Sequence, residues 1–196
     1  MAQVTLSTTA TELPRLMRCI GSRLMPAAIP ADFDTEQRDE GNAAHWLAQH
    51  LFEGGDAREG TKAPNGWVVT DDMIEHVRTY LSALDRGGQM EVETTFAGET
   101  WEVRARADHI ACFGPLGENP TLVIDDFKYG YRPVSPVENW TLLAHAIGWC
   151  IRNNVTPDRV ILRIHQPRPY HSDGPMRSWE VPGGYQGLVV RYHSIA

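Results

Sequence analysis

The sequence predicts an α+β fold in which helices flank a central mixed β-sheet. Apolar residues recur at helical spacing before residue 87, and they alternate with polar residues between about 92 and 107. A buried strand, an amphipathic helix and a further strand then follow, at 122–127, 137–151 and 159–165. Three consecutive strands can pair as a meander, and a helical crossover lets a fourth strand join parallel to one of them. We therefore expect one mixed sheet with an N-terminal helical extension.

Length and composition fit a single globular domain spanning residues 1–196. The chain is 42% hydrophobic and 22% charged, with a formal net charge of −7. This charge argues against a generally basic coat for nucleic acid, but it does not exclude a locally basic groove. The three cysteines are scattered and odd in number, which is typical of a reducing cytoplasm. No apolar run approaches membrane-spanning length and no signal-peptide pattern is present, so we expect a cytoplasmic protein without a membrane partner.

Three helices are expected in the first part of the chain. Apolar residues at helical spacing predict the first from Leu13 to Leu24, with Pro26 beyond its end. A second apolar stripe predicts a helix from Glu40 to Phe52, and His45 lies at the border of that stripe. A third helix is predicted to start at Thr70-Asp71-Asp72 and to run to Gly87-Gly88. A histidine at the border of an apolar stripe, such as His45, is usually an ordinary hydrogen-bonded residue.

The remaining elements follow from alternation and turn signals. Residues 92–96 and 101–107 alternate around the turn Ala97-Gly98-Glu99, which predicts a β-hairpin. The stretch Ser135-Pro136-Val137-Glu138 has the pattern of a capping box at a helix start. An edge strand at 188–190 is a further expectation near the C-terminal end of the sequence.

The stretch Leu122 to Gly130 organises the chain. Its apolar run predicts a buried strand that ends in the charged residues Asp126 and Lys128. Side chains two residues apart on a strand share a face, so this carboxylate and this ammonium should stand side by side. A carboxylate can bind a divalent cation, and the ammonium can steady a phosphate or a water. Taken alone, the pair is more simply a surface ion pair.

Two further groups can join this pair. Asp108 ends the preceding strand, and His45 lies on a helix that should cover the sheet. Together with Asp126 and the Phe127 carbonyl they form a mostly oxygen ligand set, which suits Mg²⁺ or Mn²⁺ better than structural zinc. Such a site can activate water for phosphodiester hydrolysis, with Lys128 orienting the water or holding the phosphate charge.

These motifs resemble the signature of the PD-(D/E)XK nuclease superfamily. Asp108 followed by Asp126-Phe127-Lys128 is similar to its core motif, and Gly41 to His45 is similar to the Gly-x-x-x-His helix of its RecB-like exonuclease branch. The resemblance is closest to phage-borne members and spans about residues 7–179. It implies a restriction-endonuclease-like αβββαβ core, metal binding by His45, Asp108 and Asp126, and catalysis by Lys128.

The sequence departs from the branch pattern at several positions. Ala105 stands where members usually carry Gly, and Thr141 and His145 stand where they carry Gln and Tyr. Relatives with an iron–sulfur cluster use one cysteine near the N-terminus and three near the C-terminus. Cys19 matches the first, but the trio is missing, so we expect no cluster and a small buried role for Cys19.

Four residues are candidates for DNA contact. These are Arg106, Arg132, Gln166 and Arg168. Gln166 and Arg168 are the better candidates because they follow a core strand that should end near the site. Arginines on exposed strand faces are nonetheless common without any such role.

Three functions remain open on this basis. The first is a Mg²⁺-dependent DNA nuclease, an exonuclease of phage recombination or replication with DNA and a phage protein as partners. The second is a catalytically silent, nuclease-fold subunit for DNA binding or assembly. The third is a metal hydrolase acting on a small phosphate ester, which shares the site and differs in the size and charge of the groove.

Overall fold

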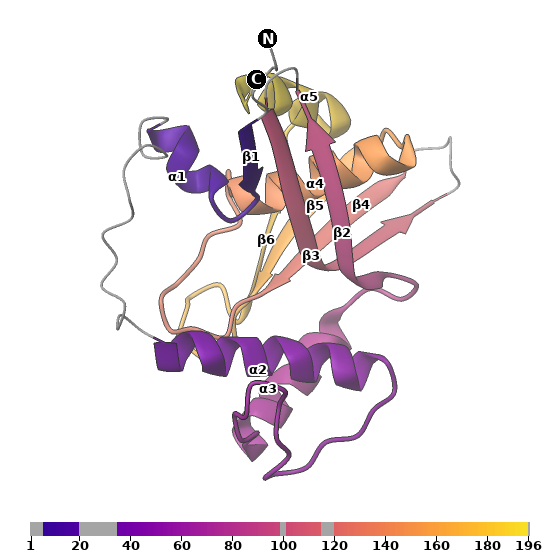
Figure 1. Cartoon of the computed structure of the whole chain (residues 1–196). Coiled ribbons are helices and arrows are strands. Elements are labelled where there is room, and N and C mark those ends of the chain that lie inside the picture. Colours follow the sequence, from indigo (N-terminus) through magenta and orange to yellow (C-terminus); the bar gives the residue numbers. More distant parts are fainter. Residues whose placement is uncertain (1–5, 20–34, 99–100, 115–119, 196) are drawn as a thin grey trace.

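The computed structural model describes residues 6–19, 35–98, 101–114 and 120–195. In this part of the chain a six-stranded mixed sheet is flanked by helices, which confirms the predicted fold class (Figure 1). The elements, in chain order, are β1 (Leu6–Thr9), α1 (Leu13–Arg18), α2 (Thr35–Phe52), α3 (Asp71–Ala83), β2 (Gln89–Ala97), β3 (Trp101–Phe113), β4 (Thr121–Phe127), α4 (Trp140–Asn153), β5 (Arg159–His165), β6 (Met176–Glu180) and α5 (Gly184–Ile195).

The sheet contains the predicted meander and crossover. β2 is antiparallel to β3, β3 is antiparallel to β4, and β5 joins parallel to β4 after the α4 crossover. Two strands that the sequence analysis missed extend this core. β1 lies parallel to β3, and β6 lies antiparallel to β5.

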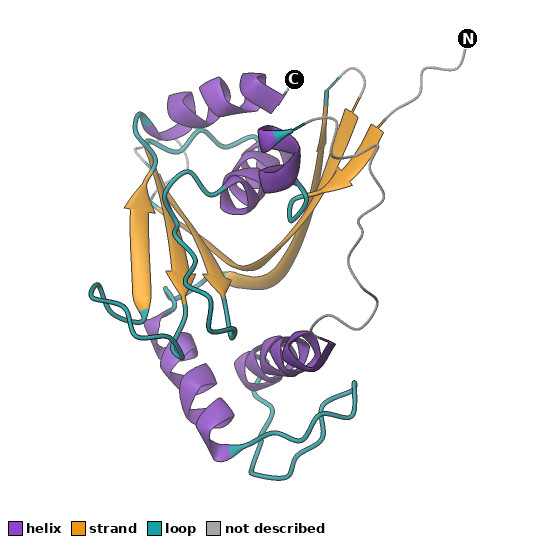
Figure 2. Cartoon of the chain, turned by 90° about the vertical axis from the view of Figure 1, so that its left-hand side faces the viewer, coloured by secondary structure: helices purple, strands orange, loops and turns teal. Residues whose placement is uncertain are grey.

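One hydrophobic core lies between the sheet and α4. The sheet curves around this helix, which Figure 2 shows nearly end-on in its concave side. Leu142, Leu143 and Ile147 of α4 pack there against β-strand residues such as Ile124 and Leu162. Asn139 caps the helix, since its side-chain oxygen accepts from the backbone N–H groups of the next turn.

A second core joins α2 and α3 to the end of the sheet where β4 ends (Figure 1). Phe127 is fully buried in it, and its ring stacks on Tyr80 of α3 with the centroids 4.7 Å apart. Thr70 caps α3 by accepting from the N–H of Met73 at 3.2 Å, as its position before the helix predicts. β4 therefore contributes to both cores, with Ile124 in the first and Phe127, at the C-terminal end of the strand, in the second.

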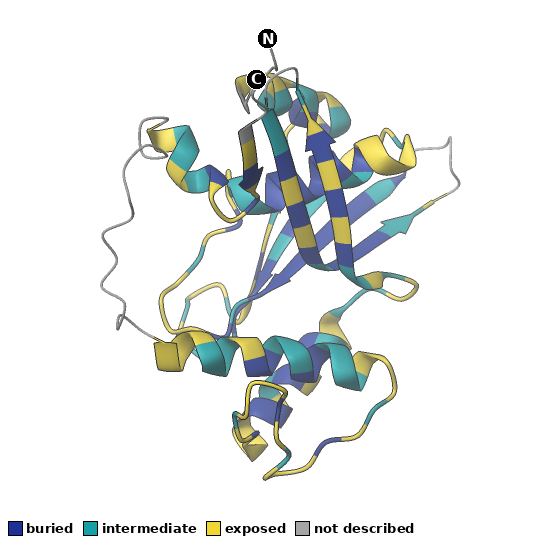
Figure 3. Cartoon of the chain, in the orientation of Figure 1, coloured by how far each residue is buried: buried dark blue, intermediate teal, exposed yellow. Residues whose placement is uncertain are grey.

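The β2–β3 hairpin changes character at Asp108. Buried and exposed residues alternate along β2 and the first part of β3 (Figure 3). From His109 to Ala111 the residues of β3 are all buried, because both faces of the strand are now covered. Asp108 thus marks the point where the hairpin leaves solvent and enters the body of the protein.

Two expectations about the C-terminal half are wrong. Residues 188–190 belong to α5 and not to an edge strand, because Leu188 packs into the core as part of a helix. The helix predicted to start at Ser135 begins at Trp140 instead. Glu138 has a left-handed backbone (φ 49°) and binds Arg191 of α5, so it cannot complete a capping box.

The N-terminal expectations need partial correction. α1 ends at Arg18, and Cys19 is extended and exposed, not a small buried residue. The remainder of the predicted first helix, and Glu99 of the hairpin turn, lie outside the described residues. No helix in the described ranges is both long enough and apolar enough to cross a bilayer.

Candidate active site

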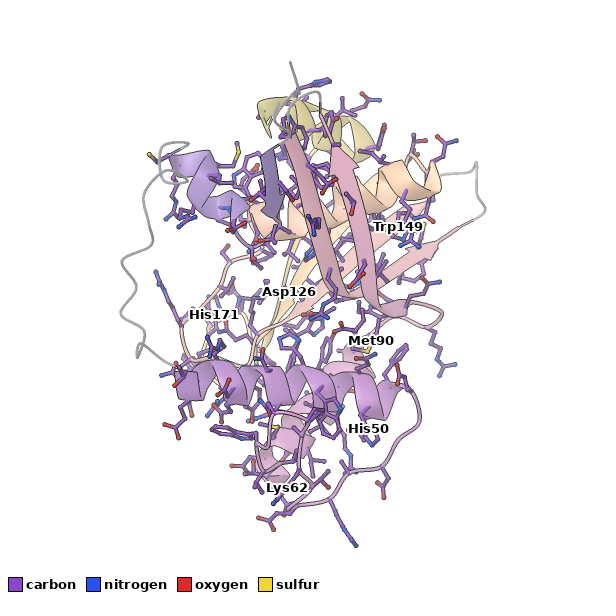
Figure 4. All side chains as sticks on the ribbon, in the orientation of Figure 1. His50, Lys62, Met90, Asp126, Trp149 and His171 are labelled. Atoms are coloured by element: carbon purple, nitrogen blue, oxygen red, sulfur yellow. The ribbon has the colours of Figure 1, made fainter. Side chains whose placement is uncertain are left out.

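Asp108, Asp126, Lys128 and His45 line one cleft, with a volume of about 970 Å³. α2 forms one wall, the β2–β3 hairpin and the start of α4 form the others, and β4 reaches it with its C-terminal end. Figure 4 shows Asp126 just above α2, where this helix crosses the end of the sheet. The structure thus brings together four residues that are far apart in the sequence, from His45 to Lys128.

Asp126 and Lys128 form an ion pair, as their spacing along the strand predicts. The Lys128 ammonium donates to Asp126 Oδ1 at 2.8 Å. The backbone N–H of Lys128 donates to the His165 carbonyl at 2.8 Å. This bond continues the β4–β5 pairing and holds Lys128 beside Asp126. Burial lowers the pKa of Lys128, but the Asp126 and Asp108 carboxylates outweigh it and raise this pKa above its usual value. Lys128 is therefore a permanent cation in the cleft.

Asp108 has two partners from different elements. Its Oδ1 lies 3.3 Å from His45 Nδ1 on α2, and its Oδ2 accepts the Phe127 backbone N–H at 2.7 Å. Burial raises the pKa of Asp108, but His45 outweighs burial and lowers this pKa well below its usual value. Burial likewise lowers the pKa of His45, and Asp108 more than compensates, so the pKa of His45 is raised.

The donor chemistry of these residues fits a hard divalent cation such as Mg²⁺ or Mn²⁺. Asp108 and Asp126 would hold it with carboxylate oxygens, and His45 would add an imidazole. Asp126 Oδ2 is buried against the Lys128 ammonium, which lies 2.7 Å away, so a cation would compete with Lys128 for this oxygen.

The side chains are not arranged as a finished ligand cage. Within the described ranges, no group of three or more His, Cys, Asp or Glu side chains has the geometry of a metal site. Asp126 is paired with Lys128, and Asp108 is in contact with His45. A cation would therefore have to replace some of these contacts. The Phe127 carbonyl, which the sequence suggested as a further ligand, stays a prediction.

Of the four DNA-contact candidates, only Arg106 lines the cleft, with its Nε 3.1 Å from Glu91 Oε2. Arg132 is exposed outside it. Gln166 is 1% exposed, and its amide group donates to the Gly130 and Arg132 carbonyls at 2.8 Å each. The Gln166 side chain thus shapes the loop after β4, and it has no capacity left for DNA.

Arg168 is also engaged within the protein. Its Nη1 lies 2.5 Å from Glu40 Oε2 on α2. The guanidinium carbon lies 4.5 Å from the centroid of the Tyr129 ring and 4.1 Å from that of Tyr131. This arrangement joins the loops after β4 and β5 to α2, so Arg168 helps to hold this wall of the cleft in place.

Sequence reasoning missed a buried polar network on the opposite face of β4. Asp125 is fully buried and contacts His109 Nδ1 at 2.9 Å and His165 Nε2 at 2.7 Å. Burial raises the pKa of Asp125, but hydrogen bonds from the two histidines outweigh it and lower this pKa. The adjacent residues Asp125 and Asp126 were the available signal, since neighbours on a strand face opposite sides. The partners depend on strand register, which the sequence does not reveal.

Glu91 is a second residue that was missed. It faces Asp108 across the hairpin, between the paired residues Met90–His109 and Val92–Ala107. Its backbone is left-handed (φ 54°), which is uncommon for a glutamate. Burial raises the pKa of Glu91, and Arg106 partly offsets this. No local pattern in the sequence signals this conformation.

No family model matches this chain, and no curated protein matches it. Among solved structures, one named SSO0001 aligns with a TM-score of 0.37 at 15% identity, over 100% of this chain and 78% of that chain. Another, named "Putative exonuclease" from Eubacterium rectale, aligns with a TM-score of 0.37 at 9% identity, over 87% of this chain and 84% of that chain. Likenesses of this size do not define a function.

Proposed function

We propose that this protein is a metal-dependent nuclease that hydrolyses phosphodiester bonds in DNA, with the cleft as its active site. The observation that carries the proposal is the Lys128–Asp126 ion pair, which shares the cleft with Asp108 and His45. Carboxylates next to a positively charged side chain in a cleft are components that metal-assisted phosphate hydrolysis uses.

Each of these residues has a distinct role in this proposal. When bound, Mg²⁺ or Mn²⁺ supplies Lewis-acid stabilisation of phosphate charge and a more acidic water. Lys128 stays protonated because of its raised pKa, so it acts as a fixed positive charge for a phosphate oxygen or the attacking water, not as a general base. Asp126 orients Lys128 through the 2.8 Å hydrogen bond. His45 orients the Asp108 carboxylate from α2.

The walls of the cleft favour a polymer over a small phosphate ester. At about 970 Å³, the cleft lies at the upper end of the range for small-molecule pockets. Arg104 and Arg106 line the wall formed by the β2–β3 hairpin, where they can contact phosphates next to the scissile one. The choice of DNA over RNA rests on the family resemblance, so both are compared in the experiment below.

One observation favours a second candidate, a catalytically silent subunit that binds DNA. Asp126 and Asp108 each contact a partner within the protein, and the described residues contain no finished metal cage. A protein that had lost metal binding could keep such internally paired charges as a binding surface. This candidate predicts binding of DNA without cleavage.

The deciding experiment incubates purified protein with end-labelled linear, circular and single-stranded DNA, and with RNA, in Mg²⁺, Mn²⁺ or EDTA. The nuclease proposal predicts shortened DNA products in Mg²⁺ and Mn²⁺ and none in EDTA. Retention of labelled DNA on the protein without any product in either metal supports the silent subunit instead. Neither binding nor cleavage of any substrate contradicts both candidates.

A further inference from the structure

Trp46 is an aromatic residue of the cleft that the proposed mechanism does not use. It follows His45 on α2, it is half-buried, and it lines the cleft together with Asn42 and Gln49. Residues three or four positions apart share one side of a helix, so these side chains form a continuous wall. An indole therefore stands beside His45 on the wall that α2 contributes to the cleft.

The Trp46 ring is supported by His50, one turn further along α2. The two rings are stacked, with their centroids 5.1 Å apart and an angle of 13° between their planes. His50 is not one of the residues that line the cleft. Figure 4 shows His50 on the lower side of α2, whereas Asp126 lies above this helix. His50 thus holds the indole from outside the cleft.

His50 is itself fixed by the turn that ends α2. Its Nε2 lies 3.0 Å from the carbonyl oxygen of Asp56. The backbone of Gly55 lies so close to the ring that a Cβ at this position would come within 2.4 Å of Nε2. A larger residue would push the ring away, so this glycine allows His50 to keep both contacts. The plane of the indole is therefore set before any ligand binds, which lowers the entropy cost of binding.

A second wall of the cleft has a different chemistry. There the β2–β3 hairpin contributes the exposed side chains of Arg104 and Arg106. Guanidinium groups bind phosphate oxygens, and aromatic rings stack on the flat faces of nucleobases. A nucleic acid strand in this cleft can thus turn its phosphates toward the hairpin and its bases toward α2.

Stacking on Trp46 sets a condition on the substrate. In a duplex, both faces of each base are covered by neighbouring bases, so only an unpaired base or the last base at an end offers a free face. Every base has such a face, so the contact is independent of base sequence.

We propose that Trp46 is a stacking platform for an unpaired nucleobase near the scissile phosphate, and that the cleft binds a single strand in preference to a duplex. This inference rests on the nuclease proposal and extends it to the form of the substrate. Trp46 also packs against the second core. A role in that core alone predicts no binding that depends on the presence of a base.

The test compares Trp46→Leu and Trp46→Phe with the matched control Trp67→Leu, all in the full chain. Trp67 is a half-buried tryptophan that packs against the same second core and does not line the cleft. We measure Kd in EDTA for three probes: a fluorescent single-stranded oligothymidylate, its duplex, and a series of the same strand in which one nucleotide at a time lacks its base. EDTA prevents cleavage, so these readouts do not depend on metal or turnover.

The stacking platform predicts that the wild type binds the single strand more tightly than the duplex. Loss of one particular base should raise Kd by about tenfold, as expected for one stacked base. Trp46→Leu should raise Kd for the intact strand by a similar factor and should no longer distinguish the strand that lacks this base. Trp46→Phe should keep most of the affinity, and Trp67→Leu should bind like the wild type. The slope of log Kd against log salt should stay unchanged because stacking involves no charge.

The results that would overturn the inference differ from those that would overturn the nuclease proposal. If the wild type binds nucleic acid with the same Kd for every strand of the series, or prefers the duplex, the stacking platform is wrong. The same follows if Trp46→Leu keeps the wild-type Kd values. Melting temperatures identify a loss of folding, and if Trp46→Leu melts far below Trp67→Leu, the series on the wild type and Trp46→Phe decides. If the wild type neither binds nor cleaves any nucleic acid, the nuclease proposal is wrong and the stacking platform falls with it.

Discussion

The backbone N–H of Phe127 donates to Asp108 Oδ2 across a distance of 2.7 Å. The last paired residues of the β3–β4 ladder are His109 and Asp125, so this N–H lies just beyond the regular pairing. The Asp108 side chain takes the place of a backbone acceptor there. A residue of the candidate active site thereby also closes the end of the sheet.

This double role predicts that two substitutions of Asp108 will differ in their effect on the stability of the protein. Asp108→Ala removes the acceptor for the Phe127 N–H, and the free energy of unfolding should fall by about 1–3 kcal/mol. Asp108→Asn keeps a carbonyl oxygen for that N–H, so its stability should stay closer to that of the wild type. Both should lose cleavage because neither supplies a carboxylate. Urea unfolding and a cleavage assay check the pair; equal stability of the two variants contradicts the proposed closure of the sheet.

Lys128→Ala should slow DNA cleavage while the protein still folds and binds DNA. The interaction of its ammonium strengthens as charge builds on the phosphate, so the cleavage rate should fall by roughly two to three orders of magnitude. DNA binding should weaken by only about one phosphate contact. Lys62→Ala is the matched control, because Lys62 is exposed and lies on the far side of α2 from Asp126 (Figure 4). A Lys128→Ala variant as active as this control shows that the role given to Lys128 is wrong.

Asp126→Asn should lose cleavage for a different reason from Lys128→Ala. It removes a carboxylate that would hold the cation, so the affinity for Mn²⁺ should drop together with turnover. Lys128→Ala should leave Mn²⁺ affinity unchanged or improve it, since Asp126 then loses a competing partner. Titration calorimetry with Mn²⁺ distinguishes the two variants. Wild-type Mn²⁺ affinity in Asp126→Asn contradicts the assignment of this residue as a ligand.

The buried Asp125 predicts a pH-dependent contribution to stability. Its pKa is lowered in the folded state, so its contribution is fully present above the unfolded pKa and is lost as pH falls through the folded one. At pH 7, Asp125→Asn should lower the free energy of unfolding by about 1–3 kcal/mol, because an amide cannot replace the carboxylate as acceptor for both His109 and His165. This difference should shrink below about pH 4, the unfolded pKa of an aspartate.

Unfolding in urea at several pH values measures this effect. Asp173→Asn serves as the control, since the side chain of Asp173 is 74% exposed. A stability difference between wild type and Asp125→Asn that does not change with pH contradicts the network's dependence on the Asp125 charge.

The features that the sequence could predict are those set by short-range periodicity. Asp126 and Lys128 meet because residues two apart on a strand share a face, and the hairpin and crossover follow from alternation and order. The helix carrying His45 was likewise evident from its apolar stripe. These features depend on neighbours within a few residues, which the sequence displays directly.

Features set by long-range register could not be predicted in this way. The partners of Asp125 are fixed only when β3, β4 and β5 align. Gln166 was expected to contact DNA, but its amide group is engaged by the loop after β4. The apolar run at 188–190 suggested a strand, but packing of Leu188 against the core makes it part of a helix. In each case a tertiary contact outweighed the local pattern.

The central claim is that phosphodiester hydrolysis in this cleft depends on a divalent cation. The most direct measurement follows the cleavage of end-labelled linear DNA by wild-type protein, first in Mg²⁺, then in excess EDTA, then after Mg²⁺ is restored in excess over the chelator. We predict cleavage in Mg²⁺, none in EDTA and recovery on restoration, with Ca²⁺ unable to substitute because it acidifies its bound water less. Undiminished cleavage in EDTA would contradict the claim.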